Sequence, residues 1–472
     1  MDTSGINKAI FKNYDIRGIY PDDLNGEAAY WTGRALGKMI GKGPVILGRD
    51  MRLGGNELFA NVLKGLNDSG VDVCDIGIVP VEAVYFAVAF LDYSGGVMIT
   101  ASHNPKEYNG FKMVVKKTPI PETQKASLKE NPSFSTGSTM EWIRGLEILD
   151  FLSKNEFPDL ETKGVSTKRD IWKEYIEHVL KFADVSKIKR LKVVVDAGNG
   201  MAGKVIPMLA PHLPIDVTPL SFELDGNFPN HPSNPLIPES QEEITQKVLA
   251  IGADLGVIFD GDADRLFFVD DKGEFIRADM TLLLLAKKLL EENPGAGVAY
   301  NVICSRMVPE KIKEWGGVPL RAAVGFVIVA NAMRENNGVM GGELSGHYSF
   351  RDNGFADSGF IALLIILQMI SESGQKLSEI MESFQKYAKG DEVNFSLEGL
   401  SAPGVIEEVS KRYADAKQDR LDGLTFEYPD WWANVRASNT EPLLRVTIEA
   451  NTPELFVLKK DELLGFIKSL KK

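Results

Sequence analysis

The sequence predicts an α/β protein with three similar α/β domains around a central cleft and a smaller C-terminal α+β domain. Chain length is the first reason, because 472 residues exceed what one hydrophobic core holds at roughly 100–200 residues per domain. The second is a repeat of short β-branched runs and helical stretches through about the first 350 residues, which is typical of parallel α/β units. The last ~85 residues have a different order of helices and strands.

Composition and charge narrow the classes of protein and ligand. Apolar residues make up 44% and charged residues 25% of the chain, which excludes a disordered, collagen-like or disulfide-rich protein. The 53 Lys and Arg residues against 66 Asp and Glu residues give a formal charge of −13. Nucleic acid and membrane surfaces are therefore not expected as partners. A small phosphorylated ligand would need a local cluster of positive groups.

Cysteine usage and hydropathy predict a cytoplasmic protein. Two cysteines, Cys74 and Cys304, are too few for a disulfide framework or a paired-cysteine zinc site. Residues 1–18 mix charged with apolar residues, so we expect no secretory leader there. The longest apolar stretch, residues 360–370, is about half of the ~20 residues that a membrane span needs. We expect it to form a buried helix.

Each predicted α/β unit has three strands, and the last strand of each ends at a polar loop. The strands are predicted at residues 45–47, 71–78 and 96–100, at 192–195, 215–217 and 255–259, and at 298–300, 318–320 and 338–340. The loops are residues 101–105, 260–265 and 342–347. Ligands of open α/β sheets bind beyond the carboxyl ends of the strands. The pattern thus indicates one cleft served by three domains, with chance coincidence of polar loops as the alternative.

Polar, lysine-rich or glycine-containing stretches divide the chain into four predicted domains. Their limits are 1–150, 151–272, 273–388 and 389–472. The last domain is predicted to contain a helix at 405–416, strands at 424–428, 432–436 and 443–449, and a final helix. Residues 116–140, rich in Lys, Thr, Ser and Pro, are predicted to be an exposed, mobile connection.

The first polar loop offers a nucleophile. Ser102 follows a predicted buried strand and is flanked by His103, an arrangement expected of an exposed nucleophile or phosphate acceptor. The segment by itself fits a structural role at least as well, with Ser102 or Thr100 as a helix cap and His103 as a hydrogen-bonded loop residue.

The second polar loop carries three alternating carboxylates, Asp260, Asp262 and Asp264, and indicates a Mg²⁺ site. Held ~5 Å apart, each pair would repel by about 3 kcal/mol at an effective dielectric constant of 20, so convergence requires a cation. The alternative is a solvated acidic turn. An EF-hand is disfavoured because Arg265 and Asp271 stand where it needs Gly and Glu. An aspartate-nucleophile phosphotransferase using Asp260 is a further alternative, although Asp264 stands where that class has Thr or Val.

Two more loops carry groups that suit a sugar phosphate. A glycine-flanked turn carries Glu343, Ser345 and His347, whose side chains suit hydrogen bonds to vicinal sugar hydroxyls. The alternative is a purely structural turn with a helix cap. A loop near the C-terminus carries a guanidinium and hydrogen-bond donors that suit a phosphate dianion. They are the guanidinium of Arg436, the hydroxyls of Ser438 and Thr440, and loop amides. The structural alternative there is an ion pair between Arg436 and Glu441.

Two glycine-rich stretches give little support for a nucleotide cofactor. Residues 33–39 are one residue short of a P-loop and lack its Ser or Thr. Gly198, Gly200 and Gly203 fit the spacing of a dinucleotide fingerprint, but the nearby acid Asp216 lies inside a predicted strand instead of at its end.

Taken in order along the chain, these motifs resemble the α-D-phosphohexomutase family, specifically its phosphomannomutase/phosphoglucomutase branch. That family has three similar α/β domains and a smaller fourth one. Leu344 and Asn439 favour the hexose branch, because the glucosamine-phosphate mutases usually have Gln and Gly there. The likeness runs almost from end to end. Besides the four loops, it covers Tyr14-Asp-Ile-Arg-Gly18, Gly48-Arg-Asp-Met-Arg52, Tyr108-Asn-Gly-Phe-Lys112, Asp196-Ala-Gly-Asn-Gly200 and Gly226-Asn-Phe-Pro-Asn-His231.

The resemblance implies a role for each candidate residue. Ser102 would be the phosphoserine and would share Mg²⁺ with Asp260, Asp262 and Asp264. The substrate-binding residues would be Tyr14, His103, Arg265, Glu343, Ser345 and His347, with Glu343 and Ser345 on the sugar O3 and O4 hydroxyls. The non-reacting phosphate would be bound by Arg436, Ser438, Asn439 and Thr440. The acid/base candidates would be Arg17, Lys112 and His347, and Arg49, Asp50 and Arg52 would hold the first domain together.

The implied reaction interconverts hexose 1-phosphate and hexose 6-phosphate, with mannose and/or glucose as the sugar. Phosphoserine 102 would give its phosphoryl group to the substrate, and the resulting hexose 1,6-bisphosphate would turn over and return its other phosphate. We expect Mg²⁺ as cofactor, hexose 1,6-bisphosphate as activator, small-molecule sugar phosphates as partners, and a monomer or homodimer. A phosphoglucosamine mutase is the alternative within the family.

Overall fold

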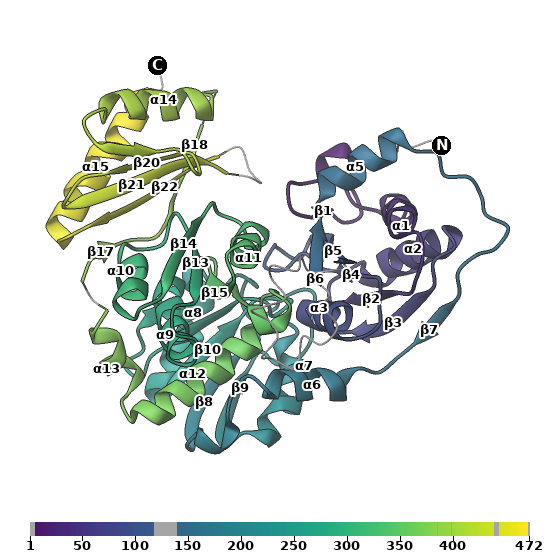
Figure 1. The fold of residues 1–472 in the computed structure, drawn as a ribbon, viewed down its shortest axis with the longest axis horizontal. Coiled ribbons are helices and arrows are strands. Elements are labelled where there is room, and N and C mark those ends of the chain that lie inside the picture. Colours follow the sequence, from purple (N-terminus) through teal and green to yellow (C-terminus); the bar gives the residue numbers. More distant parts are fainter. Residues whose placement is uncertain (1–4, 118–138, 385, 398, 439–442, 471–472) are drawn as a thin grey trace.

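Four β-sheets, one after another along the chain, organise the molecule (Figure 1). The computed structural model describes residues 5–117, 139–384, 386–397, 399–438 and 443–470. In this part of the chain, short 3₁₀ helices supplement the α-helices at Lys8–Ile10, Val185–Lys187, Ala210–His212 and Arg351–Asn353.

The first sheet has seven strands. They are β1 (Ile16–Ile19), β2 (Val45–Arg49), β3 (Val73–Ile78), β4 (Gly95–Ile99), β5 (Tyr108–Lys117), β6 (Thr139–Ile143) and β7 (Ser166–Lys168). The helices of this unit are α1 (Gly26–Ile40), α2 (Gly55–Asp68), α3 (Val81–Phe90) and α5 (Gly145–Lys154). The strand order is β1-β5-β4-β2-β3-β7, with β6 beside β5. Strand β7 lies beyond residue 150 and still pairs with β3; the predicted domain limits stay predictions. Of the predicted mobile connection, residues 118–138 lie outside the described residues.

The second and third sheets have five and four strands. The second contains β8 (Leu191–Asp196), β9 (Ile215–Leu220), β10 (Leu255–Phe259), β11 (Leu266–Val269) and β12 (Phe275–Ile276), with helices α6 (Trp172–Leu180), α7 (Ala202–Leu209) and α8 (Pro238–Ile251). The third contains β13 (Gly297–Asn301), β14 (Val318–Ala322), β15 (Gly338–Gly342) and β16 (Tyr348–Phe350), with α9 (Ala278–Glu292), α10 (Met307–Glu314), α11 (Phe326–Glu335), α12 (Gly359–Ser373) and α13 (Leu377–Glu382).

One strand arrangement recurs in the first three sheets and confirms the predicted repeat. Three parallel strands stand in the spatial orders β4-β2-β3, β10-β8-β9 and β15-β13-β14. In each unit the chain then leaves the third parallel strand through a polar loop and enters an antiparallel neighbour, which is β5, β11 or β16. The three polar loops of the sequence therefore occupy equivalent places, at the carboxyl ends of β4, β10 and β15.

The apolar stretch at residues 360–370 forms most of α12, a buried helix as predicted. Residues Phe360–Leu367 are all at most 2% exposed. The Ser358 side chain caps the helix by accepting a hydrogen bond from the Ile361 backbone N–H, and Gly374 ends it in the left-handed region with a φ of 66°. No helix in the described part of the chain is long and apolar enough to cross a membrane.

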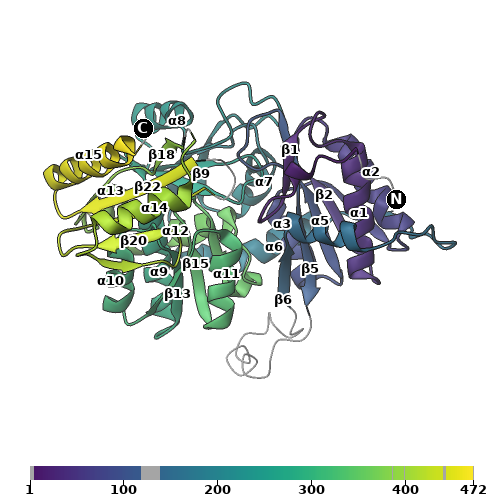
Figure 2. The same ribbon diagram turned by 90° about the horizontal axis from the view of Figure 1, so that it is seen from above.

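The C-terminal unit has an antiparallel sheet and a separate core. Its strands are β17 (Ala388–Lys389), β18 (Val393–Ser396), β19 (Lys417–Asp419), β20 (Leu424–Glu427), β21 (Trp431–Ala437) and β22 (Leu443–Ala450), and its helices are α14 (Ala402–Arg412) and α15 (Pro453–Ser469). One hydrophobic cluster runs through the first three units, whereas the C-terminal unit has its own. Figures 1 and 2 show this unit beside the third one, with α15 at its outer edge.

Candidate active site

The loop after β4 holds Ser102 in a constrained conformation. Ser102 has a φ of 52°, which few residues other than Gly adopt. Its backbone N–H donates to Thr100 Oγ1 at 2.9 Å. The buried guanidinium of Arg52 donates through Nη2 to the carbonyl oxygens of Ser102 and Asn104. A hydroxyl and a guanidinium thus fix the backbone of Ser102, from which its side chain projects.

Ser102 meets the aspartate loop of the second unit. Its Oγ donates to Asp260 Oδ2 at 2.7 Å. Asp260, Asp262 and Asp264 each offer one carboxylate oxygen within 4.8 Å of the others, and all three are at most 1% exposed. Ala263 bends the loop with a φ of 67°. The carboxylates converge and are buried, so the loop is not the solvated acidic turn of the structural alternative.

The acidic cluster fits a divalent cation. Asp262 Oδ1 has no hydrogen-bond partner among the described residues, and carboxylate oxygens are the ligands that Mg²⁺ prefers. Burial and the charges of Asp262 and Asp264 raise the pKa of Asp260 to about 7. Three carboxylates held this close together and this deeply buried are the condition that a bound cation relieves.

Lys112 on β5 is the nearest counter-charge. Its Nζ lies 2.7 Å from Asp262 Oδ2 and also contacts Asp264. Burial opposes the charge of Lys112, but Asp262 and Asp264 outweigh burial and hold the pKa of Lys112 well above its usual value. The ammonium group therefore stays charged at the junction of the first two units.

The loop after β15 brings Glu343 and Ser345 to the same region. Glu343 Oε1 accepts from the Asn301 side chain at 3.1 Å and from the Gly325 backbone N–H at 2.8 Å. Despite burial, hydrogen bonds and the charge of His347 hold the pKa of Glu343 below its usual value. An ionised carboxylate beside the Ser345 hydroxyl suits recognition of sugar hydroxyls.

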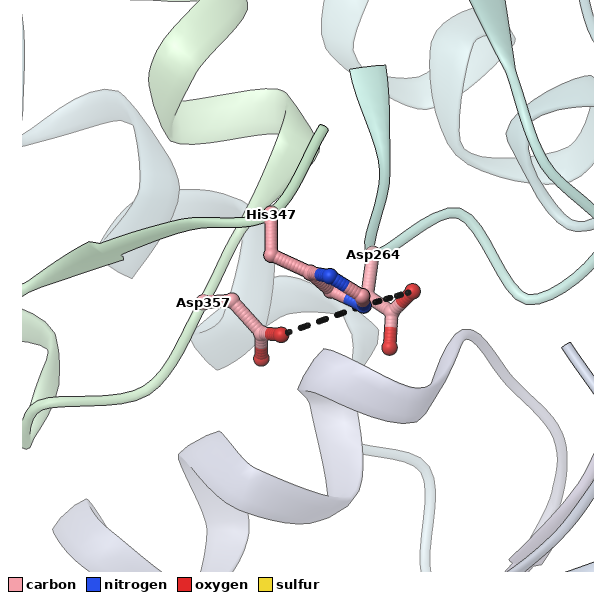
Figure 3. Close-up of side chains that lie close together, drawn as sticks. All are labelled: Asp264, His347 and Asp357. Carbon is pink, nitrogen blue, oxygen red and sulfur yellow. Dashed lines mark ion pairs between the residues drawn. The ribbon is translucent and has the colours of Figure 1, made fainter. Parts of the chain in front are cut away.

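His347 lies between carboxylates of two units, Asp264 and Asp357 (Figure 3). Its Nε2 is 3.5 Å from Asp264 Oδ1 and 3.9 Å from Asp357 Oδ2, and Ser345 Oγ lies 2.9 Å from its Nδ1. Burial and Arg265 lower the pKa of His347, but Asp264 and Glu343 more than offset them and raise it to about 9. His347 therefore carries a proton at neutral pH.

The remaining candidates of the first unit line the same region. Tyr14 donates its hydroxyl to the Val324 carbonyl oxygen at 3.0 Å, which joins the first unit to the third. Burial raises the pKa of Tyr14 to about 12; Glu343 and Asp422 add to the effect, and Arg436 opposes it. Charges from the third and fourth units thus act on Tyr14.

Arg17 and His103 flank the serine. Arg17 pairs with Asp15 and donates to the Asn104 side chain. The Nδ1 of His103 lies 3.3 Å from Ser102 Oγ. Burial and the positive charges of Arg265 and Arg17 hold the pKa of His103 well below its usual value, so its imidazole is neutral.

Arg436 near the C-terminus lies at the end of β21, buried at 2% exposure. Its Nη2 donates to Glu392 at 2.8 and 3.1 Å. The backbone N–H of Ser438 donates to the Leu443 carbonyl oxygen. Asn439, Thr440 and Glu441, which are part of the predicted phosphate loop and of its ion-pair alternative, lie outside the described residues.

The glycine fingerprint at Gly198–Gly203 has a structural explanation. The Met201 backbone N–H donates to the Gly261 carbonyl oxygen at 2.9 Å, and a Cβ on Gly200 would lie 2.6 Å from that same oxygen. Gly200 therefore allows the backbone to approach the aspartate loop closely, and no cofactor is needed to explain it.

The sequence did not predict that Arg52, Asp357 and Glu392 contact residues of the candidate site. Arg52, expected to hold the first domain together, contacts the serine loop itself. Its place in the Gly48–Arg52 motif was the available signal. Asp357 and Glu392 carry no local signal, because each reaches its partner through the fold.

Comparison with known proteins matches all four units in order. Models described as phosphoglucomutase/phosphomannomutase alpha/beta/alpha domains I, II and III and C-terminal domain match residues 8–132, 173–273, 277–387 and 392–462. A protein named "Phosphohexose mutases" from Xanthomonas campestris pv. campestris is 39% identical over 443 residues, 93% of this chain and 94% of that one. The phosphomannomutase/phosphoglucomutase of Pseudomonas aeruginosa is 36% identical over 454 residues, with 94% and 92% covered.

A solved structure extends the similarity to three dimensions. The phosphoglucomutase/phosphomannomutase family protein from Burkholderia thailandensis aligns with a TM-score of 0.84 at 31% identity, covering 98% of both chains. The four domain models match in the same order as the four units of this chain, and the solved structure shares their fold. The chain belongs to the phosphoglucomutase/phosphomannomutase family of α-D-phosphohexomutases.

Proposed function

We propose that this protein interconverts hexose 1-phosphate and hexose 6-phosphate, with mannose and/or glucose as the sugar, through a phosphoserine at position 102. The hydrogen bond of 2.7 Å from Ser102 Oγ to Asp260 carries this proposal. The bond supports the proposal because it joins a hydroxyl of one unit to a buried carboxylate cluster of another.

Phosphoryl transfer asks the protein mainly for positioning and charge stabilisation. Asp260, Asp262 and Asp264 would hold Mg²⁺ together with an oxygen of Ser102, and the cation would stabilise negative charge on the transferred group. Thr100 and Arg52 hold the serine loop in place, which would position the Ser102 hydroxyl before the substrate binds.

Each transfer also moves one hydroxyl proton. Arg17, Lys112 and His347 are the candidates for general acid and base, and Lys112 and His347 are both protonated in this arrangement. Tyr14, His103 and Arg265 would line the substrate site, with Glu343 and Ser345 on the O3 and O4 hydroxyls.

The bisphosphate intermediate has to bind in two orientations. The distal site must therefore recognise what both orientations share, which is a phosphate and the O3/O4 pair. Arg436 and Ser438, with Asn439 and Thr440, would bind that phosphate. None of the proposed substrate-binding residues is assigned to the hydroxyl at C2, so we propose that mannose and glucose phosphates are both substrates. We also propose that hexose 1,6-bisphosphate activates the enzyme.

A coupled mutase assay tests the proposal with Mg²⁺, a trace of hexose 1,6-bisphosphate, and mannose, glucose or glucosamine 1-phosphate. We expect turnover of the two hexose phosphates, slow turnover of the glucosamine compound, and a loss of roughly 10³-fold or more in Ser102→Ala. The exposed Ser153→Ala is the matched control. Near-wild-type turnover by Ser102→Ala would remove the assignment.

The aspartate-nucleophile alternative predicts a different phosphoenzyme. An acyl phosphate on Asp260 is labile to alkali, whereas a serine phosphate ester survives acid. Peptide mapping of the labelled enzyme should place the phosphate on Ser102, because Asp260 accepts the serine hydrogen bond and lies 3.7 Å from Arg265. We also propose a cytoplasmic location, where the buried free thiols of Cys74 and Cys304 stay reduced.

A further inference from the structure

Two guanidinium groups of the C-terminal unit share one carboxylate. Arg436 on β21 and Arg445 on β22 stand directly opposite each other in the sheet register. Glu392, between β17 and β18, accepts from Arg436 Nη2 with both carboxylate oxygens. Its Oε2 also lies 3.4 Å from Arg445 Nη1, and Thr447 Oγ1 lies 3.5 Å from its Oε1.

Glu392 reduces the electrostatic repulsion between Arg436 and Arg445. Like charges directly opposite on neighbouring strands repel, and the Arg436 side chain is only 3% exposed, so water screens it poorly. A buried cation without a partner is strongly unfavourable. Glu392 supplies a negative charge that both guanidinium groups contact, and so it lessens the repulsion between them.

We propose that Glu392 is a positioning residue for the distal phosphate site: it holds Arg436 and Arg445 side by side, so that Arg436 meets the non-reacting phosphate of the substrate in a fixed orientation. The Nε of Arg436 has no hydrogen-bond partner among the described residues, so the guanidinium keeps donor capacity while Nη2 is held. The inference rests on the proposed function, because it concerns how that phosphate is bound.

The opposite role makes the opposite prediction. If Glu392 only occupied Arg436 in competition with the substrate phosphate, its removal would free the guanidinium and lower the KM. If Glu392 positions Arg436, removal of the Glu392 carboxylate should raise the KM, because the Arg436 guanidinium loses its fixed orientation.

Steady-state kinetics with mannose 1-phosphate separate these roles. Glu392→Gln keeps the shape of the side chain and removes its charge, and we expect the KM to rise about 10-fold or more with kcat within about threefold. The matched control is Glu408→Gln, an exposed residue of the same unit that pairs with Lys411. An unchanged or lower KM in Glu392→Gln would overturn the inference. A wild-type enzyme inactive on every hexose 1-phosphate would instead overturn the proposed function.

A double-mutant cycle tests whether Glu392 acts through Arg436. In an Arg436→Lys background, we expect Glu392→Gln to change the KM by less than about threefold, because the residue that it orients is already altered. Independent, multiplicative effects would contradict the inference. If thermal unfolding shows that the Gln variant does not fold, Glu392→Asp replaces it. Its shorter side chain cannot reach both guanidinium groups, so a several-fold higher KM supports the proposal and an unchanged KM overturns it.

Discussion

The Thr100 hydroxyl connects the two halves of the reaction centre, and its removal tests how closely that centre is held. Thr100 Oγ1 accepts from the Ser102 backbone N–H and lies 3.1 Å from Asp262 Oδ2, to which it donates. Thr100→Val keeps the shape and removes both bonds. We expect kcat to fall about 10–100-fold, because small displacements of a nucleophile are costly, with a loss of about 1–3 kcal/mol in stability.

The exposed Thr162→Val is the control for this substitution. Mutase kinetics and thermal unfolding measured on both variants separate a catalytic effect from a folding effect. A Thr100→Val enzyme with wild-type kcat would show that Ser102 is held by Arg52 and the backbone alone.

His178 gives the molecule a pH-dependent stability. It is 6% exposed on α6, its Nε2 lies 2.9 Å from Asn353 Oδ1, and its ring packs against Phe86 and Phe90. Burial lowers the pKa of His178 from 6.5 to about 4. Between these values the unfolded chain binds a proton that the folded chain does not, so stability falls as the pH drops through this window and is constant above it.

The full effect of His178 is about 3 kcal/mol at pH values below both pKa values. Thermal unfolding of wild type and His178→Gln at pH 4.5 to 8 measures the part of this effect that develops above pH 4.5. We expect the wild-type midpoint to decrease more steeply than that of the variant below pH 6.5. Parallel curves would mean that His178 titrates alike in the folded and unfolded chains.

Among the elements, the parallel strands were predictable, whereas contacts between residues far apart in the sequence were not. Strand β10 is a continuous run of buried apolar residues, as expected where helices cover both faces of a parallel sheet, and so its position and the loop after it could be read locally. The contact of Glu392 with Arg436 joins residues 44 positions apart, and that of Tyr14 with Val324 joins residues 310 apart. Such pairs depend on the assembled fold, and no local pattern specifies them.

The loop between β8 and α7 shapes the aspartate loop through Gly200. A Cβ there would lie 2.6 Å from the Gly261 carbonyl oxygen and 2.9 Å from its Cα, and neither backbone atom can move without moving Asp260 and Asp262. We expect Gly200→Ala to destabilise the protein by about 1–3 kcal/mol and to raise the Mg²⁺ concentration needed for half-maximal activity.

Gly465→Ala is the matched control, since a Cβ at that helical position meets no atom within 4 Å. It should be neutral or stabilise α15 by up to about 1 kcal/mol. Unaltered Mg²⁺ dependence in Gly200→Ala would show that the aspartate loop tolerates displacement.

At the scale of the whole molecule, the candidate site residues come from units that differ in how firmly they are joined to one another. The serine, aspartate and Glu343 loops belong to three units that share one hydrophobic cluster, so their mutual geometry is fixed by a common core. Arg436 belongs to a unit with its own cluster, joined to the third unit largely through polar contacts such as Val324 with Asp422. We therefore expect the C-terminal unit to be able to move without disturbing the serine and aspartate loops, as the proposed reorientation of a bisphosphate intermediate requires.

Arg306 is a main polar contact between these bodies, and its loss should uncouple them. Its Nη2 donates to the carbonyl oxygens of Tyr428 and Trp431 at 2.6 and 3.1 Å. In Arg306→Met we expect the C-terminal unit to unfold in a separate calorimetric transition about 10 °C below the rest, because two charge-assisted bonds are lost from a domain of this size. Arg420→Met, which breaks an exposed pair with Glu407 inside that unit, should leave the main profile nearly unchanged. If all four units still melted together in Arg306→Met, the C-terminal core would depend on the other three units, and independent movement of the C-terminal unit would lose its structural basis.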